Sequence, residues 1–563
     1  MRLASGLALA TGLAVVAAGC GGGGSSSSST SATSTGGVAG TSTSVNSKGK
    51  TFPLLKLAWE PPDYFDPALA YTVESWQIMW NVYDGLLTYK HAPGGAGATL
   101  IPALAQSMPQ VSNGGTVYKF TLRPNLKYSN GKPVKASDFA CSIERDYQMQ
   151  SPGVGFFSSI KGANAYGKLG ASKMKSQHIS GIKTNDSART ITITLDHPEA
   201  DMQNILAMEF AAFVPCGTPA SDQSTHPTPA TGPYVIQNYQ PHKSFTLVRN
   251  KYFNLPDVPK GNPDKVTATL TSDNSRAANM VAQNQADYDF LAIPTDRLGS
   301  YQKKYGNRIK IYTPANTYYL FFNQRTKPFD NIKARQAVNY AIDRNQFVQI
   351  FGGLARTTQN FLPPTYKGIG YQKINYYHYN LSKAKQLVKQ SGTAGTKITV
   401  WSPNVEPDKS LMEYVQAQLN KIGYNAQLKL LDPQVYFQTI ENQSTKAQTG
   451  YVDWYQDYPN PIDWFDVLVN GQRITQTHNN NVGNVNDPKI NQMIDKLKSQ
   501  TKQPSAQAKQ WAEIGHRLVV TDAAVGPYVN RSGTDFFSSR MDLGCYYNHV
   551  LYQWDFSTIC VKS

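Results

Sequence analysis

Residues 318–344 read YYLFFNQRTKPFDNIKARQAVNYAIDR. The opening run of apolar and aromatic side chains predicts a buried strand over 318–322. Asp330 or Asn331 can cap a helix, and the apolar positions that follow have helical spacing: Ala334, Ala337, Val338, Ala341 and Ile342. A strand followed directly by an amphipathic helix is typical of an α/β protein.

The same alternation continues to residue 431. The apolar pattern predicts further helices over 384–392 and 411–422 and strands over 398–401 and 426–431. Upstream, period-two patterns predict half-buried strands at 118–122, 191–195 and 245–247. We therefore expect a mixed α/β body, in which the region after about residue 316 forms a compact lobe of its own.

The N-terminal segment has the order of an export signal: Arg2, a short apolar run over 3–18, then small residues before Cys20. The sequence VAAGC at 16–20 resembles the lipobox of bacterial lipoproteins. That resemblance implies a signal peptide over 1–19 and lipidation of Cys20. The alternative is an ordinary secretory signal with an incidental cysteine. Residues 20–50 are almost entirely Gly, Ser, Thr and Ala, which predicts a flexible tether.

The chain carries a formal charge of +16, from 54 basic and 38 acidic residues. The basic residues are scattered and no nucleic-acid motif accompanies them, so we expect no nucleic-acid partner. A basic surface facing an anionic cell envelope explains the charge more simply.

Four cysteines remain after Cys20, an even number that favours disulfides in an exported protein. Three pairings are possible; the local choice is Cys545–Cys560, which leaves Cys141–Cys216. Free buried thiols are the alternative. The chain has no CxxC motif and its histidines are dispersed, so we expect neither a metal site nor a cofactor.

Several short blocks are spread over nearly the whole chain after the tether: VYDGLL at 82–87, YKFTLR at 118–123, SNGKPV at 129–134, TGPY at 231–234, RNKY at 249–252, RQAVNYAIDR at 335–344 and WYQDYPNP at 454–461. In content and order they resemble the peptide-type extracellular solute-binding proteins of ABC importers, often called family 5. The resemblance implies an α/β, two-lobed periplasmic-binding-protein-like fold of type II. It also implies an extra subdomain on the first lobe and a hinged cleft between the lobes.

Mapped onto this chain, the family fold predicts the following division. The first lobe takes 51–90, 229–313 and 520–563; the extra subdomain takes 91–228; the second lobe takes 314–519. The chain is therefore expected to cross between the lobes near 314 and near 520, and paired crossovers act as a hinge.

The implied function is that of a substrate-binding lipoprotein, which captures oligopeptides and delivers them to ABC permease subunits. We expect a monomer, not an enzyme, held by its lipid at the outer face of the cytoplasmic membrane, in the cell envelope or periplasm. Signalling or chaperone-like peptide binding would use the same site with a different partner.

Asp457 is the first candidate for ligand contact. In similar peptide binders, the aspartate three residues after the tryptophan of this block pairs with the α-ammonium of the peptide, and Trp454 and Asp457 keep that spacing. The alternative is that Asp457 caps the following turn. Further candidates are aromatic residues that line the cleft or pack beneath it: Trp454, Tyr455, Tyr458, Trp464 and Trp401. Asn323 is another, which contacts ligand or holds backbone.

One departure from the family pattern concerns the peptide carboxylate. Dipeptide binders hold it with an arginine in the segment after the 398–401 strand, but here Lys409 is the only cation between 401 and 414. Lysine is a poorer bidentate partner for a carboxylate, so strict dipeptide specificity is not expected. An oligosaccharide, a metal chelate or another solute remains an alternative cargo. An exported hydrolase is a more distant one, because neither HExxH nor GxSxG occurs.

Overall fold

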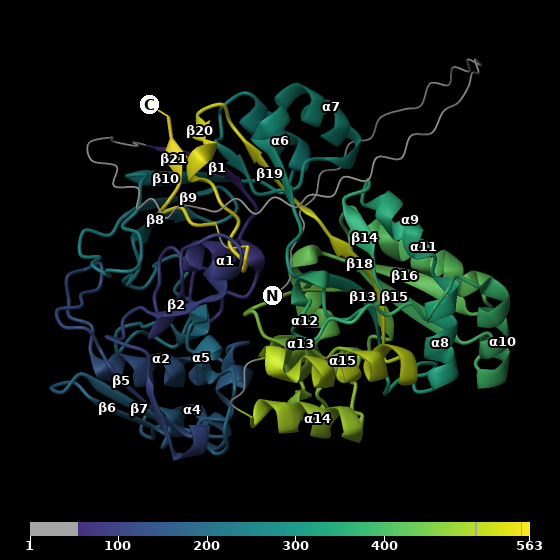
Figure 1. Cartoon of the computed structure of the whole chain (residues 1–563), viewed down its shortest axis with the longest axis horizontal. Helices are drawn as coiled ribbons and strands as arrows, with labels where there is room; N and C mark the ends of the chain where they lie inside the picture. Colours follow the sequence, from purple (N-terminus) through teal and green to yellow (C-terminus); the bar gives the residue numbers. More distant parts are fainter. Residues whose placement is uncertain (1–53, 501–503, 553, 563) are drawn as a thin grey trace.

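The computed structural model describes residues 54–500, 504–552 and 554–562. The expected signal peptide, Cys20 and the tether lie outside the described residues. Figure 1 shows two lobes side by side, with a smaller subdomain continuing the first lobe downward. In the part of the chain that the structure describes, no helix has the length and apolar character needed to cross a membrane.

The first lobe is built on a seven-stranded mixed sheet. Its order is β12 (Ile309–Tyr312), β19 (Gly533–Phe537), β11 (Tyr288–Asp289), β1 (Leu55–Trp59), β10 (Lys265–Leu270), β9 (Ser244–Arg249) and β8 (Tyr234–Gln240). The central strand β1 runs parallel to both β10 and β11, so the carboxyl ends of these three strands lie at one edge. Helices of this lobe are α1 (Val73–Met79), α6 (Asn274–Ala282) and α7 (Thr295–Tyr305).

The second lobe is built on a six-stranded sheet. Its order is β14 (Ala355–Thr357), β18 (Val525–Arg531), β13 (Asn316–Phe322), β17 (Thr449–Tyr455), β15 (Lys397–Pro403) and β16 (Asn425–Leu431). All residues of β13 and β17 are buried, which explains why most of their side chains are apolar or aromatic. The helices are α8 (Ile332–Ala341), α9 (Arg344–Ile350), α10 (Leu381–Ser391), α11 (Asp408–Lys421), α12 (Pro433–Ile440), α13 (Pro461–Val469), α14 (Pro488–Lys498) and α15 (Ala508–His516).

Residues 318–344 form the strand and the capped helix that their sequence predicts. The side chain of Asn331, one of the two predicted caps, accepts the backbone N–H of Lys333 at 2.9 Å and starts α8. The apolar stripe of α8 is buried and the helix packs against α10. The predicted strand is confirmed as β13 and begins two residues earlier, at Asn316.

The extra subdomain contains a four-stranded antiparallel sheet within the expected range 91–228. Its order is β4 (Gln110–Ser112), β5 (Val117–Thr121), β7 (Thr190–Thr194) and β6 (Ile182–Asn185). Helices α2 (Ala136–Gln148), α3 (Ala163–Gly167), α4 (Ala171–Met174) and α5 (Met202–Ile205) accompany it, and the pair β2 (Leu87–Tyr89) and β3 (Leu100–Pro102) leads into it.

Both expected disulfides are present in the structure. Cys141 of α2 is joined to Cys216 with an S–S distance of 2.03 Å, and the bridge closes a separation of 75 residues. Cys545 is joined to Cys560 over 15 residues, beside the small hairpin-like pair β20 (Met541–Asp542) and β21 (Cys560–Val561). One bridge therefore fastens the subdomain and the other fastens the C-terminal segment.

The chain crosses between the two sheets at two neighbouring places. The first crossover lies between Tyr312 of β12 and Asn316 of β13, where the expectation put it. The second lies between Arg531 of β18 and Gly533 of β19, about a strand later than the expected position near 520. The reason is that β18 pairs with β13 and β14, which makes 525–531 part of the second sheet.

Candidate ligand-binding cleft

Two adjacent cavities lie between the lobes. One measures about 90 Å³ and the other about 420 Å³, and the larger is of the size that small-molecule sites have. Both are lined from the two lobes at once, and they share these lining residues: Asn274, Ala292, Glu406, Pro407 and Arg531. We call this pair of cavities the cleft.

The position of the cleft follows from the direction of the strands. In the first lobe its wall comes from residues that follow the parallel strands β1, β10 and β11, such as Glu60, Asn274 and Ala292. In the second lobe the wall includes Tyr455 at the end of β17 and Arg531 at the end of β18. Ligands of open α/β sheets bind outside the carboxyl ends of strands, and here two such edges face each other.

Asp457 lies where the two lobes meet, close to the smaller cavity. Its Oδ2 accepts the hydroxyl of Tyr71, from the first lobe, at 2.8 Å, and its backbone N–H donates to Asp463 Oδ2 at 3.1 Å. Tyr455, two residues earlier, lines the smaller cavity, as does Tyr552, whose hydroxyl donates to the carbonyl of Gln456. Asp457 itself is buried and does not line either cavity.

The surroundings of Asp457 are acidic. Burial, with the charge of Asp457 adding to it, raises the pKa of Asp463 well above its usual range. Burial also raises the pKa of Glu209 to about 8, again with a contribution from Asp457. Asp463 lies in the first turn of α13, where it also accepts the indole N–H of Trp454 at 3.2 Å. A cluster of carboxyl groups that repel one another favours a cationic ligand group.

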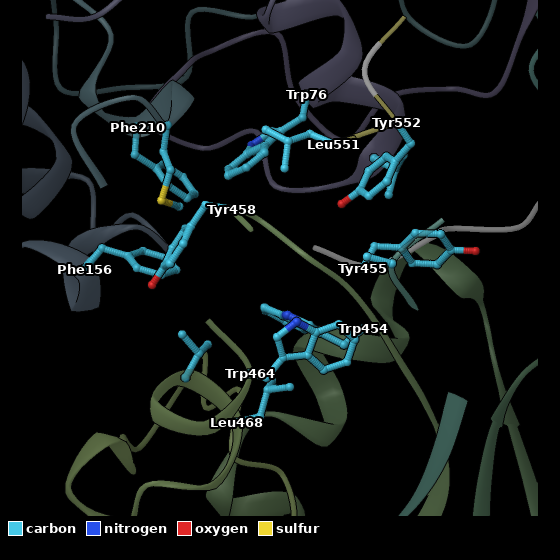
Figure 2. Close-up of a cluster of buried hydrophobic side chains, with 14 of the residues drawn as sticks. Trp76, Phe156, Phe210, Trp454, Tyr455, Tyr458, Trp464, Leu468, Leu551 and Tyr552 are labelled. Atoms are coloured by element: carbon cyan, nitrogen blue, oxygen red, sulfur yellow. The ribbon is translucent and has the colours of Figure 1, made fainter. Parts of the chain in front are cut away.

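The predicted aromatic residues gather at the interface of the lobes. Figure 2 shows Trp454, Tyr455, Tyr458 and Trp464 of the second lobe facing Trp76, Phe210 and Tyr552 on the other side. Trp454, Tyr458 and Trp464 are buried, and the hydroxyl of Tyr458 donates to Asp201 of the subdomain. Of the aromatic residues named as candidates from the sequence, only Tyr455 lines the cleft, and ligand contact by Trp454, Tyr455 and Tyr458 stays a prediction.

The other predicted residues take different positions. Lys409 lines the larger cavity, where its ammonium lies 3.8 Å from Glu413. Trp401 is buried against the ammonium of Lys429 on the neighbouring strand, 4.4 Å from its ring centroid, and does not line either cavity.

Asn323 follows the end of β13 that points away from the cleft. Its amide donates to the carbonyl of Ala447 at 2.8 Å and accepts the side-chain amide of Asn484 at 3.1 Å. The register pairs Asn316, at the other end of the strand, with Tyr455 in the cleft wall. Since a strand rises about 3.3 Å per residue, the two ends lie roughly 20 Å apart. This position favours the alternative that Asn323 holds backbone, while ligand contact at Asn323 stays a prediction.

Contacts that join the lobes directly show that the protein is in a closed arrangement. Besides the Tyr71–Asp457 bond, Gln456 donates to the carbonyl of Val550 at 2.8 Å. Lys498 of α14 bonds Glu199 of the subdomain at 3.1 Å and Asp466 of α13 at 2.7 Å. Closure therefore forms polar contacts on both sides of the interface.

Two residues of this region were not anticipated from the sequence: Tyr71 and Arg531. Neither belongs to a block that suggested a role in binding. Tyr71 reaches Asp457 across 386 residues of sequence, and Arg531 reaches the cleft because β18 belongs to the second sheet. Only the three-dimensional arrangement of the lobes brings them to the site.

Comparison with known proteins identifies the family. The model for the bacterial extracellular solute-binding proteins, family 5, matches residues 99–476. The chain belongs to this family. The sequence resemblance and the two-lobed fold class are thereby confirmed.

Relatives of this family 5 protein include the dipeptide-binding protein of Escherichia coli K12, which is 27% identical over 433 residues, covering 72% of this chain and 76% of the relative. The glutathione-binding protein GsiB of Salmonella typhi is 27% identical over 366 residues, covering 61% of this chain and 66% of the relative. Among solved structures, the clavulanic acid biosynthesis oligopeptide binding protein 2 superposes with a TM-score of 0.78 at 22% identity, covering 91% of this chain and 96% of the other.

Proposed function

We propose that this family 5 protein captures oligopeptides outside the cytoplasmic membrane and delivers them to the permease of an ABC importer. Asp457 carries the proposal, because a buried carboxylate at the lobe interface meets a hydroxyl from the opposite lobe and two further carboxyl groups. A peptide α-ammonium supplies the positive charge and the donors that this cluster of carboxyl groups favours.

Closure of the lobes links binding to delivery. Tyr71 and Asp457 come from different lobes, so a ligand group held between them binds the closed form better than the open form. A ligand shifts such an equilibrium only by that difference in affinity. A permease that recognises the closed form would then receive loaded protein.

Three observations from the comparisons support a peptide as cargo. The relatives are named for binding a dipeptide and glutathione, and the similar structure is named an oligopeptide binding protein. We extend the proposal to a monomer anchored through a lipid on Cys20, which rests on the lipobox-like sequence.

The identity of the cargo is tested by unfolding the purified protein and identifying released molecules by mass spectrometry. Peptides of mixed sequence and similar length are the expected result, since backbone recognition leaves side chains free to vary. A sugar or a chelate would overturn the peptide assignment. A peptide mixture incubated with the protein should be returned unchanged, whereas cleavage products would favour the hydrolase alternative.

A further inference from the structure

Arg531 is the cationic side chain that lines both cavities of the cleft. It is the last residue of β18, next to the second crossover, and is only partly buried. Its backbone is fixed by Asn316, whose side-chain amide accepts the Arg531 N–H at 2.9 Å and donates to the Arg531 carbonyl at 2.9 Å. The side chain therefore projects from a rigid point of the cleft wall.

The guanidinium is held in place by aromatic neighbours. Its carbon lies 5.3 Å from the ring centroid of Phe351, which also lines the larger cavity, and Nη1 lies 3.4 Å from the hydroxyl of Tyr318. Among the described residues, no carboxylate oxygen lies within 4.0 Å of the Arg531 guanidinium. Stacking on an aromatic ring orients a guanidinium without neutralising its charge.

Two carboxyl groups in the neighbourhood of this side chain, Glu406 and Asp408, make no ion pair with it within 4.0 Å. Glu406 shares the cleft wall, but its Oε2 accepts the hydroxyl of Ser410 and the residue is exposed to solvent. Asp408 is buried, and burial raises its pKa well above the usual range. A partly desolvated cation with no anion beside it favours an anionic ligand group.

We propose that Arg531 binds the α-carboxylate of a short peptide whose α-ammonium is held at Asp457. This inference rests on the proposed function and deepens it, because it assigns the second end of the ligand. A guanidinium presents paired N–H donors that match a carboxylate in a bidentate manner, which a lysine cannot do. Arg531 thus takes the place of the family arginine that the segment after β15 lacks.

The register of the second sheet sets the length of the peptide. Arg531 on β18 and Asp457 after β17 flank β13, on which Asn316 bonds Arg531 and pairs with Tyr455. Across the sheet, Arg531 and Tyr455 are separated by two strand spacings of about 4.8 Å each. Asp457 lies two residues further along the chain, so the backbones of Arg531 and Asp457 are about 12 Å apart. An extended chain spans about 3.3–3.6 Å per residue, so tri- and tetrapeptides match the distance between these backbone positions and are the first probes.

The test uses tri- and tetrapeptides with randomised side chains, prepared both as free acids and as C-terminal amides. Each mixture is equilibrated with the refolded, ligand-free protein, and retained peptides are quantified by mass spectrometry. The wild type should prefer free acids over amides by about 30-fold or more, the loss expected when one partner of a buried charge pair is removed. Arg531→Gln should abolish that preference, and Arg531→Lys should keep part of it.

Lys409→Gln removes the other cation in the wall of the larger cavity and is measured in parallel. Lys421→Gln is the matched control, because Lys421 is exposed on α11 and lines neither cavity. It should keep the preference of the wild type. Equal retention of acids and amides by the wild type would overturn the role of Arg531 and leave the peptide function standing. Loss of the preference in Lys409→Gln and not in Arg531→Gln would likewise overturn the role of Arg531. Retention of neither mixture would instead reject the peptide function itself.

Discussion

Asn316 bonds both backbone groups of Arg531, with N–O distances of 2.9 Å in each direction. These residues begin β13 and end β18, and therefore stand beside the two crossovers between the lobes. Asn530 adds a bond from its amide to the carbonyl of Asn316 at 2.7 Å. The two crossover strands are thus fastened together at the end of the second sheet that faces the first lobe.

We predict that Asn316→Ala lowers the free energy of unfolding by about 1–3 kcal/mol, because it leaves buried backbone groups of Arg531 without their partner. Urea unfolding monitored by tryptophan fluorescence measures the change. Asn345→Ala, at an exposed position of α9, is the control and should stay within about 0.5 kcal/mol of the wild type. Equal stability of both variants would show that the Asn316 bonds do not fasten the crossover.

Residues 318–344 show what local sequence determines. The buried strand, its following cap at Asn331 and the apolar stripe of α8 all depend on neighbours within one turn or strand, and all were predicted. The second crossover was misplaced because 520–563 was treated as one piece, while β18 pairs with β13 more than 200 residues away. Arg531 was missed for the same reason, since its place in the cleft depends on that pairing.

Asp457 is the first candidate that the family resemblance gives for ligand contact, through its spacing from Trp454, and this role stays a prediction. We predict that Asp457→Asn weakens binding of a peptide with a free N-terminus by about 2–5 kcal/mol, because the ammonium loses its charged partner. Titration calorimetry with a peptide released from the wild type measures the loss. An N-acetylated form of the same peptide should bind both proteins weakly and with similar affinity.

Asp330→Asn, at an exposed position outside the cleft, is the matched control for the change in charge and should bind like the wild type. Tyr71→Phe removes the hydroxyl that donates to Asp457. It should weaken the binding free energy of the same peptide by about 0.5–1.5 kcal/mol. An unchanged affinity of Asp457→Asn, in a protein that melts like the wild type, would reject the ammonium site.

Lys498 joins the subdomain to the second lobe through Glu199 and Asp466. We predict that Lys498→Met lowers the free energy of unfolding by about 3–5 kcal/mol, because buried carboxylates lose their cation. Adding Glu199→Gln should restore part of the loss, as residues in one network do not act additively. Lys496→Met, at an exposed position of the same helix, serves as the control.

Lys498→Met should also change the pH at which the protein begins to unfold in acid. Burial alone would raise the pKa of Asp466, but Arg473 and Lys498 together hold that pKa well below its usual range. A carboxyl group with a lowered pKa stabilises the fold above its unfolded pKa, and this contribution disappears as the pH falls. In Lys498→Met the loss should begin at a higher pH, which acid titration followed by circular dichroism would detect.

His549 predicts a second effect of pH, at milder acidity. Its Nδ1 accepts the N–H of Leu551 at 3.3 Å and its Nε2 donates to the carbonyl of Lys90 at 3.1 Å, a pattern that only the neutral ring satisfies. Burial, with His91 nearby adding to it, lowers the pKa of His549 to about 4. Between this value and about 6.5 the unfolded chain binds a proton that the folded protein excludes, so stability falls as the pH is lowered.

The size of this effect follows from the two pKa values. A pKa lowered from about 6.5 to about 4 reduces the free energy of unfolding by about 3 kcal/mol, a loss that is complete below pH 4 and absent above pH 7. His549→Gln removes the titrating group, so its free energy of unfolding should change less between pH 6.5 and 4.5 than that of the wild type. His197→Gln, at an exposed position, should keep the wild-type dependence. Urea unfolding at both pH values measures the difference, and the same slope in all three proteins would show that His549 is protonated as easily in the folded state as in the unfolded chain.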